Sequence, residues 1–236
     1  MSHVRYLFAD CRWSLDDPAF GREAYRSGHI PGAVFLDVER DLSDEPGPGG
    51  RHPLPSPDRF TAAAAQAGIE HGVFVVAYGS LGGAERLWWL LRHFGHDDCA
   101  VIDLESWRGP LETGSPQRGE PAAFVPRERT DDVASLDEVA SRLGELVLVD
   151  ARVPSRWRGE PNPVDRVPGR IPGAVNAPWN EPLPRVPDGD VVAYCGSGVT
   201  SCVVLHRLHL AGRAARLYPG SWSEWEQYPE LPVERN

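Results

Sequence analysis

Short runs of apolar, β-favouring residues recur along the chain, and they alternate with longer apolar stretches typical of buried helices. The runs that predict strands are residues 6–12, 74–78, 100–103, 146–150, 191–194 and 214–218. Residues 84–94 and 200–211 have helix-like patterns. Alternation of buried strands with helices predicts an α/β fold, in which a mostly parallel sheet is covered by helices.

The chain contains the same two motifs twice. An Asp-x-Arg motif ends a predicted strand at Asp10 and again at Asp150, and a Gly-x-Ile-Pro-Gly motif begins at Gly28 and again at Gly169. The spacing from Asp to Gly is 18 residues in the first copy and 19 in the second. An internal repeat of this length, about 140 residues, predicts two copies of one domain.

Residues 109–132 are rich in Gly, Pro, Arg and Glu and show no periodicity, which is typical of a linker. We therefore expect residues 1–108 to form a first domain and residues 133–236 to form a second. The Asp-x-Arg motif occurs in both copies, so we expect it to be a structural pair that ties a strand to a loop.

Composition excludes several classes of function. The 236 residues have a net charge of −10, which argues against a surface for nucleic acid or anionic membranes. No apolar run approaches the length of about 20 residues that spans a bilayer, and the N-terminus lacks the apolar core of a signal peptide. The four cysteines contain no C-x-x-C pair, so we expect neither a disulfide framework nor a zinc site, and a cytoplasmic protein with reduced thiols.

The second copy places a cysteine, Cys195, at the end of its central strand. A glycine-containing turn and a helix follow, so backbone N–H groups and the helix dipole can stabilise an anionic sulfur. The pKa of Cys195 should therefore fall below the free-thiol value of about 8.5. The first copy has Gly79 at the matching position and no nucleophile. The loop predicted to stabilise this anion comprises Gly196, Ser197, Gly198, Val199, Thr200 and Ser201.

Together these motifs resemble the rhodanese fold, and residues 50–55, 87–92 and 220–225 match it further. The duplication is similar to that of the tandem-domain thiosulfate and 3-mercaptopyruvate sulfurtransferases. The resemblance implies two tandem rhodanese-like domains, each with a mostly parallel central sheet flanked by helices. It also implies that the first domain is non-catalytic and that the second contains the catalytic cysteine, Cys195.

The implied reaction moves a sulfur atom from a small donor to Cys195 as a persulfide, and then to cyanide, a thiol or reduced thioredoxin. No cofactor and no metal are implied. The loop is neutral at Gly196 and Ser197, where the thiosulfate type has Arg and Lys, and this favours 3-mercaptopyruvate as donor. Thiosulfate stays open, because bacterial proteins with such loops are often called thiosulfate enzymes. A persulfide carrier, or a regulatory sulfur-binding module without turnover, is the other alternative.

Two arginines are candidates for binding the donor. Arg156 matches the family's substrate-binding arginine, and its guanidinium can pair with a carboxylate through two hydrogen bonds; the alternative is a solvated surface arginine. The mercaptopyruvate group has a second arginine about nine residues later. Here that neighbourhood contains Asp165 followed by Arg166, so Arg166 is out of register and mercaptopyruvate preference is less well supported.

Ser197 is a second catalytic candidate, because Ser197, His52 and Glu39 could form a proton relay across the domain interface. Such a relay would protonate the departing enolate. The alternative is that His52 caps a loop. The related Cys-x5-Arg phosphatases are excluded, because the sixth residue after Cys195 is Ser201 rather than the arginine that holds phosphate.

Overall fold

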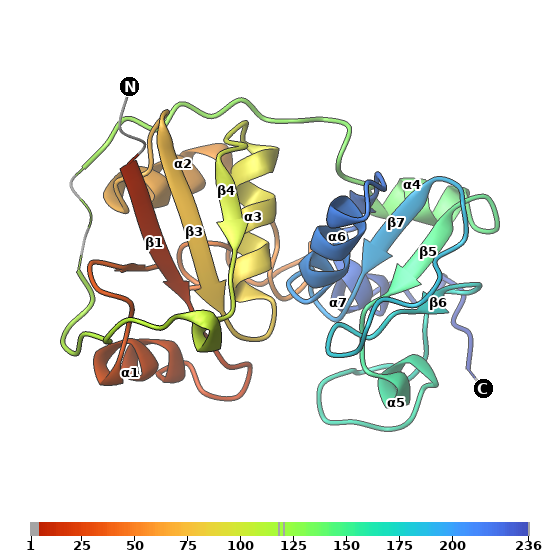
Figure 1. The fold of residues 1–236 in the computed structure, drawn as a ribbon. Coiled ribbons are helices and arrows are strands. Elements are labelled where there is room, and N and C mark those ends of the chain that lie inside the picture. The colour runs from red at the N-terminus through yellow and green to blue at the C-terminus, as the bar shows by residue number, and fades with distance from the viewer. Residues whose placement is uncertain (1–4, 118, 120, 236) are drawn as a thin grey trace. The chain divides into compact units, whose positions relative to one another are not determined.

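The computed structural model describes residues 5–117, 119 and 121–235, and the chain divides into two compact units, each with its own sheet (Figure 1). The first unit comprises Met1–Asp44 and Leu54–Arg129, and the second comprises Glu45–Pro53 and Thr130–Asn236. The short segment Glu45–Pro53 therefore belongs to the second unit, although it is flanked in sequence by the first.

The first unit contains a parallel sheet in the order β2-β1-β3-β4. Its strands are β1 (Arg5–Cys11), β2 (Val34–Phe35), β3 (Val73–Gly79) and β4 (Cys99–Val101). Its helices are α1 (Phe20–Ser27), α2 (Pro57–Gln66), α3 (Gly83–His93) and the 3-10 turn η1 (Leu104–Ser106). Helix α3 follows β3 directly and is buried along most of its length, as its apolar sequence predicts.

The second unit repeats this topology with a parallel sheet in the order β6-β5-β7-β8. Its strands are β5 (Val147–Asp150), β6 (Val175–Asn176), β7 (Val191–Tyr194) and β8 (Arg216–Leu217). Its helices are α4 (Leu136–Ser141), α5 (Pro154–Trp157), α6 (Ser201–Leu210) and α7 (Ser221–Trp225). The prediction of an α/β fold with two parallel sheets flanked by helices is confirmed.

The Asp-x-Arg motif makes the same contacts in both units. Arg152 binds Asp150 (Nη2 to Oδ2, 2.6 Å) and donates to the carbonyl of Gly169 at 2.8 Å. In the first unit Arg12 binds Asp10 at 2.5 Å and donates to the carbonyl of Gly28 at 2.7 Å. Each pair therefore joins the end of a central strand to the start of the Gly-x-Ile-Pro-Gly turn, as expected for a structural pair.

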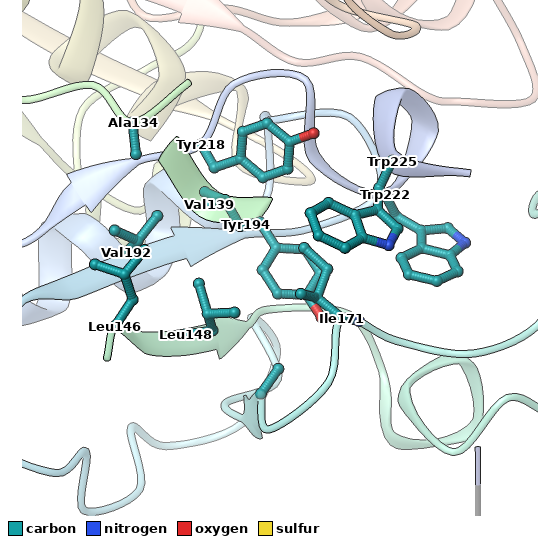
Figure 2. Close-up of a cluster of buried hydrophobic side chains, with 11 residues drawn as sticks. Ala134, Val139, Leu146, Leu148, Ile171, Val192, Tyr194, Tyr218, Trp222 and Trp225 are labelled. Carbon is teal, nitrogen blue, oxygen red and sulfur yellow. Dashed lines mark hydrogen bonds between the residues drawn. The ribbon is translucent and has the colours of Figure 1, made fainter. Parts of the chain in front are cut away.

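Four aromatic side chains form part of the buried core of the second unit. Figure 2 shows the side chains of Tyr194, Tyr218, Trp222 and Trp225 within this cluster of buried residues. The indole N–H of Trp222 donates to the carbonyl of Val167 at 3.0 Å, so its one polar atom is satisfied. The cluster therefore anchors the short helix α7 beside the end of strand β7.

Much of the stretch predicted as a linker contacts the first unit through its backbone. Glu112 exchanges hydrogen bonds with His29, and the amides of Ala122 and Arg127 donate to carbonyl groups of α2 and of Phe94. The division of the chain places residues up to Arg129 with the first unit. The limits 1–108, 109–132 and 133–236 remain a prediction.

Candidate active site

Cys195 lies directly after β7 and is 1% exposed. Its backbone amide donates to Ser221 Oγ at 3.1 Å, and its carbonyl accepts from the amide of Trp222 at 3.0 Å. The carbonyl of Gly196 likewise accepts from the amide of Ser223 at 2.9 Å. Helix α7, whose tryptophans are buried in the core, thus fixes the backbone of Cys195 and Gly196.

The loop stabilises an anionic sulfur. The amide of Gly198 donates to Cys195 Sγ at 3.2 Å, and the φ of +82° at Gly198 lies in the left-handed region that favours glycine. Burial raises the pKa of the thiol, but the hydroxyl groups of Thr200 and Ser201 and the amides of Ser197 and Ser201 outweigh it. The pKa of Cys195 is therefore lowered from its ordinary value. Ser201 Oγ is buried and has no other partner among the described residues, so its proton is available to the sulfur.

Two guanidinium groups lie over Gly196. A Cβ added there would be 2.9 Å from Arg156 Nη2 and 3.0 Å from Arg51 Nη2, so a side chain at this position would displace both arginines. Burial and then the Arg156 charge lower the pKa of Arg51, as expected for neighbouring cations. The structure therefore brings the predicted Arg156 to the loop, together with an arginine that the sequence analysis did not single out.

Arg51 and His52 reach the loop because the segment Glu45–Pro53 packs against it within the second unit. Gly50, at φ +98°, lies so close to α7 that an added Cβ would be 2.7 Å from Ser223 Oγ. That hydroxyl accepts from the amide of Arg51 at 3.0 Å, and Arg51 Nη2 donates to the carbonyl of Gly196 at 3.2 Å. The segment Gly-Arg-His-Pro was visible as a match in sequence, but nothing local assigned its arginine to this loop.

His52 and Ser197 form a buried hydrogen bond. His52 Nδ1 lies 2.7 Å from Ser197 Oγ, and the two residues are 5% and 7% exposed. Glu39 belongs to the first unit, where its amide donates to the Asp37 carboxylate at 3.1 Å. The pairing of His52 with Ser197 is present, and the complete relay to Glu39 stays a prediction.

Each of the two arginines has a carboxylate behind it. Arg156 binds Asp165 through Nε at 2.8 Å and through Nη2, while Arg51 Nη1 lies 3.7 Å from Glu226 Oε1. The arginine side chains are 19% and 28% exposed, whereas those of Asp165 and Glu226 are 1% and 3% exposed. A small molecule entering from solvent therefore meets guanidinium groups before carboxylates. Arg166 is exposed and is not one of the two arginines over Gly196.

The equivalent position in the first unit is closed. Strand β3 ends at Gly79, and an added Cβ there would be 2.8 Å from the carbonyl oxygen of Cys11 and 2.9 Å from the amide of Ala84. Real Cβ atoms do not approach backbone atoms this closely. Gly79 was predicted to mark the absence of a nucleophile, and the packing provides no space for a side chain at that place.

Among residues 5–117, 119 and 121–235, no group of three or more His, Cys, Asp and Glu side chains is arranged to hold a metal ion. In the same part of the chain no helix is long and apolar enough to cross a membrane. The four cysteines are free thiols.

The rhodanese-like domain model matches residues 2–108 and 135–228, which is most of both halves. The chain belongs to the rhodanese-like family. SseB of Mycobacterium tuberculosis, provisionally named a thiosulfate sulfurtransferase, is 40% identical to this rhodanese-like chain, over 96% of the chain and 89% of SseB. The 3-mercaptopyruvate sulfurtransferase of Escherichia coli K12 is 37% identical, over 90% of the chain and 85% of its own length.

Solved structures agree with these relatives. The structure of SseA, described as a 3-mercaptopyruvate sulfotransferase of Escherichia coli, matches with a TM-score of 0.78 and 31% identity, over 93% of both chains. The 3-mercaptopyruvate sulfurtransferase of Leishmania major matches with a TM-score of 0.84 and 28% identity, over 97% of this chain and 72% of that one. The predicted resemblance to tandem-domain sulfurtransferases is confirmed.

Proposed function

We propose that this rhodanese-like chain is a sulfurtransferase that takes a sulfur atom from 3-mercaptopyruvate onto Cys195 and passes it to a thiol or cyanide. The observation that supports this best is the combination of a buried cysteine of lowered pKa with two guanidinium groups over the adjacent glycine. The cysteine is the nucleophile, and the two guanidinium groups bind the carboxylate of a small donor. The two relatives are named for thiosulfate and for 3-mercaptopyruvate respectively, and both names support sulfur transfer as the reaction class.

In the first half-reaction the Cys195 thiolate attacks the thiol sulfur of 3-mercaptopyruvate. An S–S bond forms, the C–S bond breaks, and its electron pair leaves as the enolate of pyruvate, which takes one proton. Cys195 becomes a persulfide that keeps the hydrogen of the donor thiol. Loop amides that stabilise the thiolate are equally able to stabilise the anion that this persulfide forms when it loses its proton.

In the second half-reaction a nucleophile removes the outer sulfur. Cyanide forms thiocyanate and releases the Cys195 thiolate and a proton, while a thiol forms its own persulfide. A small thiol or a reduced thioredoxin fits this step, and a reducing compartment such as the cytoplasm suits the four free cysteines. We propose that His52 and Ser197, which share a hydrogen bond, protonate the enolate, with Glu39 as the third member of the relay.

The test is steady-state sulfur transfer to cyanide with 3-mercaptopyruvate and thiosulfate compared side by side. We expect kcat/KM for 3-mercaptopyruvate to be higher by about tenfold or more, which is the effect of one well-placed charge. Preference for thiosulfate would contradict the donor assignment while keeping the reaction class. If each donor transferred sulfur only once, without turnover, the protein would be a persulfide carrier rather than an enzyme.

Replacement of Arg156 by alanine should raise the KM for 3-mercaptopyruvate by about tenfold to a hundredfold, because a charge-assisted hydrogen bond to a carboxylate is lost. The kcat should change much less, since the carboxylate does not react. Arg158→Ala is the matched control, because Arg158 lies two residues away in an exposed pair with Glu160. Arg166→Ala tests the other candidate. A comparable rise in KM for Arg166→Ala, with no rise for Arg156→Ala, would show that Arg166 binds the donor and Arg156 does not.

A further inference from the structure

The charge of the donor site is balanced by side chains that the reaction itself does not use. Arg156 and Arg51, the two arginines over Gly196, are each paired with a carboxylate of the same unit, Asp165 and Glu226 respectively. Arg152, which also contacts Asp165, is balanced by its own partner Asp150. The charges of the arginines and carboxylates therefore cancel, and the thiolate of Cys195 is left as the uncompensated charge of this cluster. A site intended to attract a strongly charged anion would not be expected to contain both carboxylates.

We propose that Asp165 and Glu226 determine donor specificity, by lowering the positive potential over Cys195 until a monoanionic donor is favoured over a dianionic one. This inference rests on the proposed function, which it extends to the class of donor. The attraction between a donor and the site scales with the donor's charge, so each carboxylate weakens binding of a dianion about twice as much as binding of a monoanion.

Asp165 is held so that it stays charged and stays on Arg156. Its carboxylate also accepts from Arg152 Nη1 at 3.4 Å and from the side-chain nitrogen Nδ2 of Asn162 at 3.1 Å. Burial raises the pKa of Asp165, but Arg156 and Arg152 outweigh burial, and the pKa is lowered from its ordinary value. A carboxylate with this environment is ionised at neutral pH, as the proposal requires.

The geometry also leaves donor-binding capacity on Arg156. Asp165 occupies Nε and Nη2, so Nη1 remains for a carboxylate oxygen of the donor. Glu226 accepts from the amide of Val167 at 3.0 Å through Oε2, while its Oε1 is the atom nearest to Arg51. Both carboxylates are thus fixed behind the guanidinium groups, where they change the electrostatic potential without contacting the donor.

The experiment replaces each carboxylate by its amide, Asp165→Asn and Glu226→Gln, which keeps size and hydrogen-bonding oxygen while removing the charge. We expect the ratio of kcat/KM for thiosulfate to kcat/KM for 3-mercaptopyruvate to rise about tenfold in each variant. Glu160→Gln is the control, because Glu160 is a carboxylate of the same loop that is 53% exposed. Its ratio should stay within about twofold of the wild type.

A second measurement does not depend on sulfur transfer. The rates at which iodoacetate and iodoacetamide alkylate Cys195 compare an anion with a neutral molecule of similar shape. The ratio of the iodoacetate rate to the iodoacetamide rate should rise about tenfold in Asp165→Asn and in Glu226→Gln. In the wild type the ratio should not fall as salt is added, because a cluster without net positive charge offers no attraction to screen.

The proposal is overturned if both donors lose kcat/KM equally and the alkylation ratio is unchanged, since that result describes a merely structural role. It is also overturned if wild-type alkylation by iodoacetate is strongly suppressed by salt, a result that needs no variant to fold. Failure of the wild type to turn over either donor would refute the proposed function, and the alkylation ratios would still decide the charge proposal.

Discussion

Replacement of Cys195 by serine is expected to reduce sulfur transfer by about a thousandfold or more, because a hydroxyl is a far weaker nucleophile and forms no persulfide. The same substitution should leave the melting temperature within about 4 °C of the wild type. The amide of Gly198 and the hydroxyl groups around the sulfur can hydrogen-bond to a serine oxygen instead. Cyanide-dependent thiocyanate formation and thermal unfolding measure the two effects.

Cys202 supplies the matched control. It is also a buried cysteine of the second unit, and its thiol donates to the carbonyl of Gly198 at 3.4 Å, a contact that a serine can keep. Cys202→Ser should keep activity within a few fold. Mass spectrometry after treatment with donor should find the extra sulfur on Cys195 in this variant. Persistence of the extra sulfur in Cys195→Ser would refute the mechanism.

Replacement of Arg152 by methionine should lower the free energy of unfolding by about 3–5 kcal/mol, which is the cost of leaving a buried charge without its partner. The side chains of Arg152 and Asp150 are 1% and 0% exposed, and Arg152 also lies over the Trp222 ring at 4.7 Å. Burial lowers the pKa of Arg152, but Asp150 outweighs burial and the net pKa is raised. Urea unfolding followed by tryptophan fluorescence measures the loss.

Arg158→Met is the control for stability, because its pair with Glu160 is 46% and 53% exposed and should change the free energy by about 0.5 kcal/mol or less. In a double variant, Arg152→Met with Asp150→Leu, part of the lost stability should return, since the unpaired carboxylate is removed. Equal losses of stability in Arg152→Met and Arg158→Met would contradict the assignment of Arg152 and Asp150 as a buried structural pair.

The secondary structure was largely predictable because its determinants are local. The apolar run of β7 was predicted with the bounds that the structure has, and the helix predicted at residues 200–211 is α6, Ser201–Leu210. Repetition of Asp-x-Arg and Gly-x-Ile-Pro-Gly was sufficient to indicate a duplicated domain. The strand predicted at residues 214–218 is only two residues long in the structure, where β8 pairs with β7 and Leu217 also forms an isolated bridge with Val133.

Placement of the site residues was only partly predictable. Cys195 and its loop could be predicted because they lie in one contiguous stretch. Arg156 could be predicted because it matches the family's substrate-binding arginine. Arg51 was overlooked, since it lies 145 residues before Gly196, whose carbonyl it binds. Asp165 was noticed as a mismatch in register, but its role as the partner of Arg156 depends on a turn at residues 162–165 that brings it back onto α5.

The fold class, the duplication, the family and a candidate nucleophile could be predicted from the sequence, because periodicity and short motifs act over a few neighbouring residues. The charges that surround Cys195 could be identified only from the folded chain. The packing of Gly50 against α7 places Arg51 over the loop, and the burial of Asp165 and Glu226 neutralises both arginines. Electrostatic potential depends on distance in space and on burial, and neither can be counted along the chain.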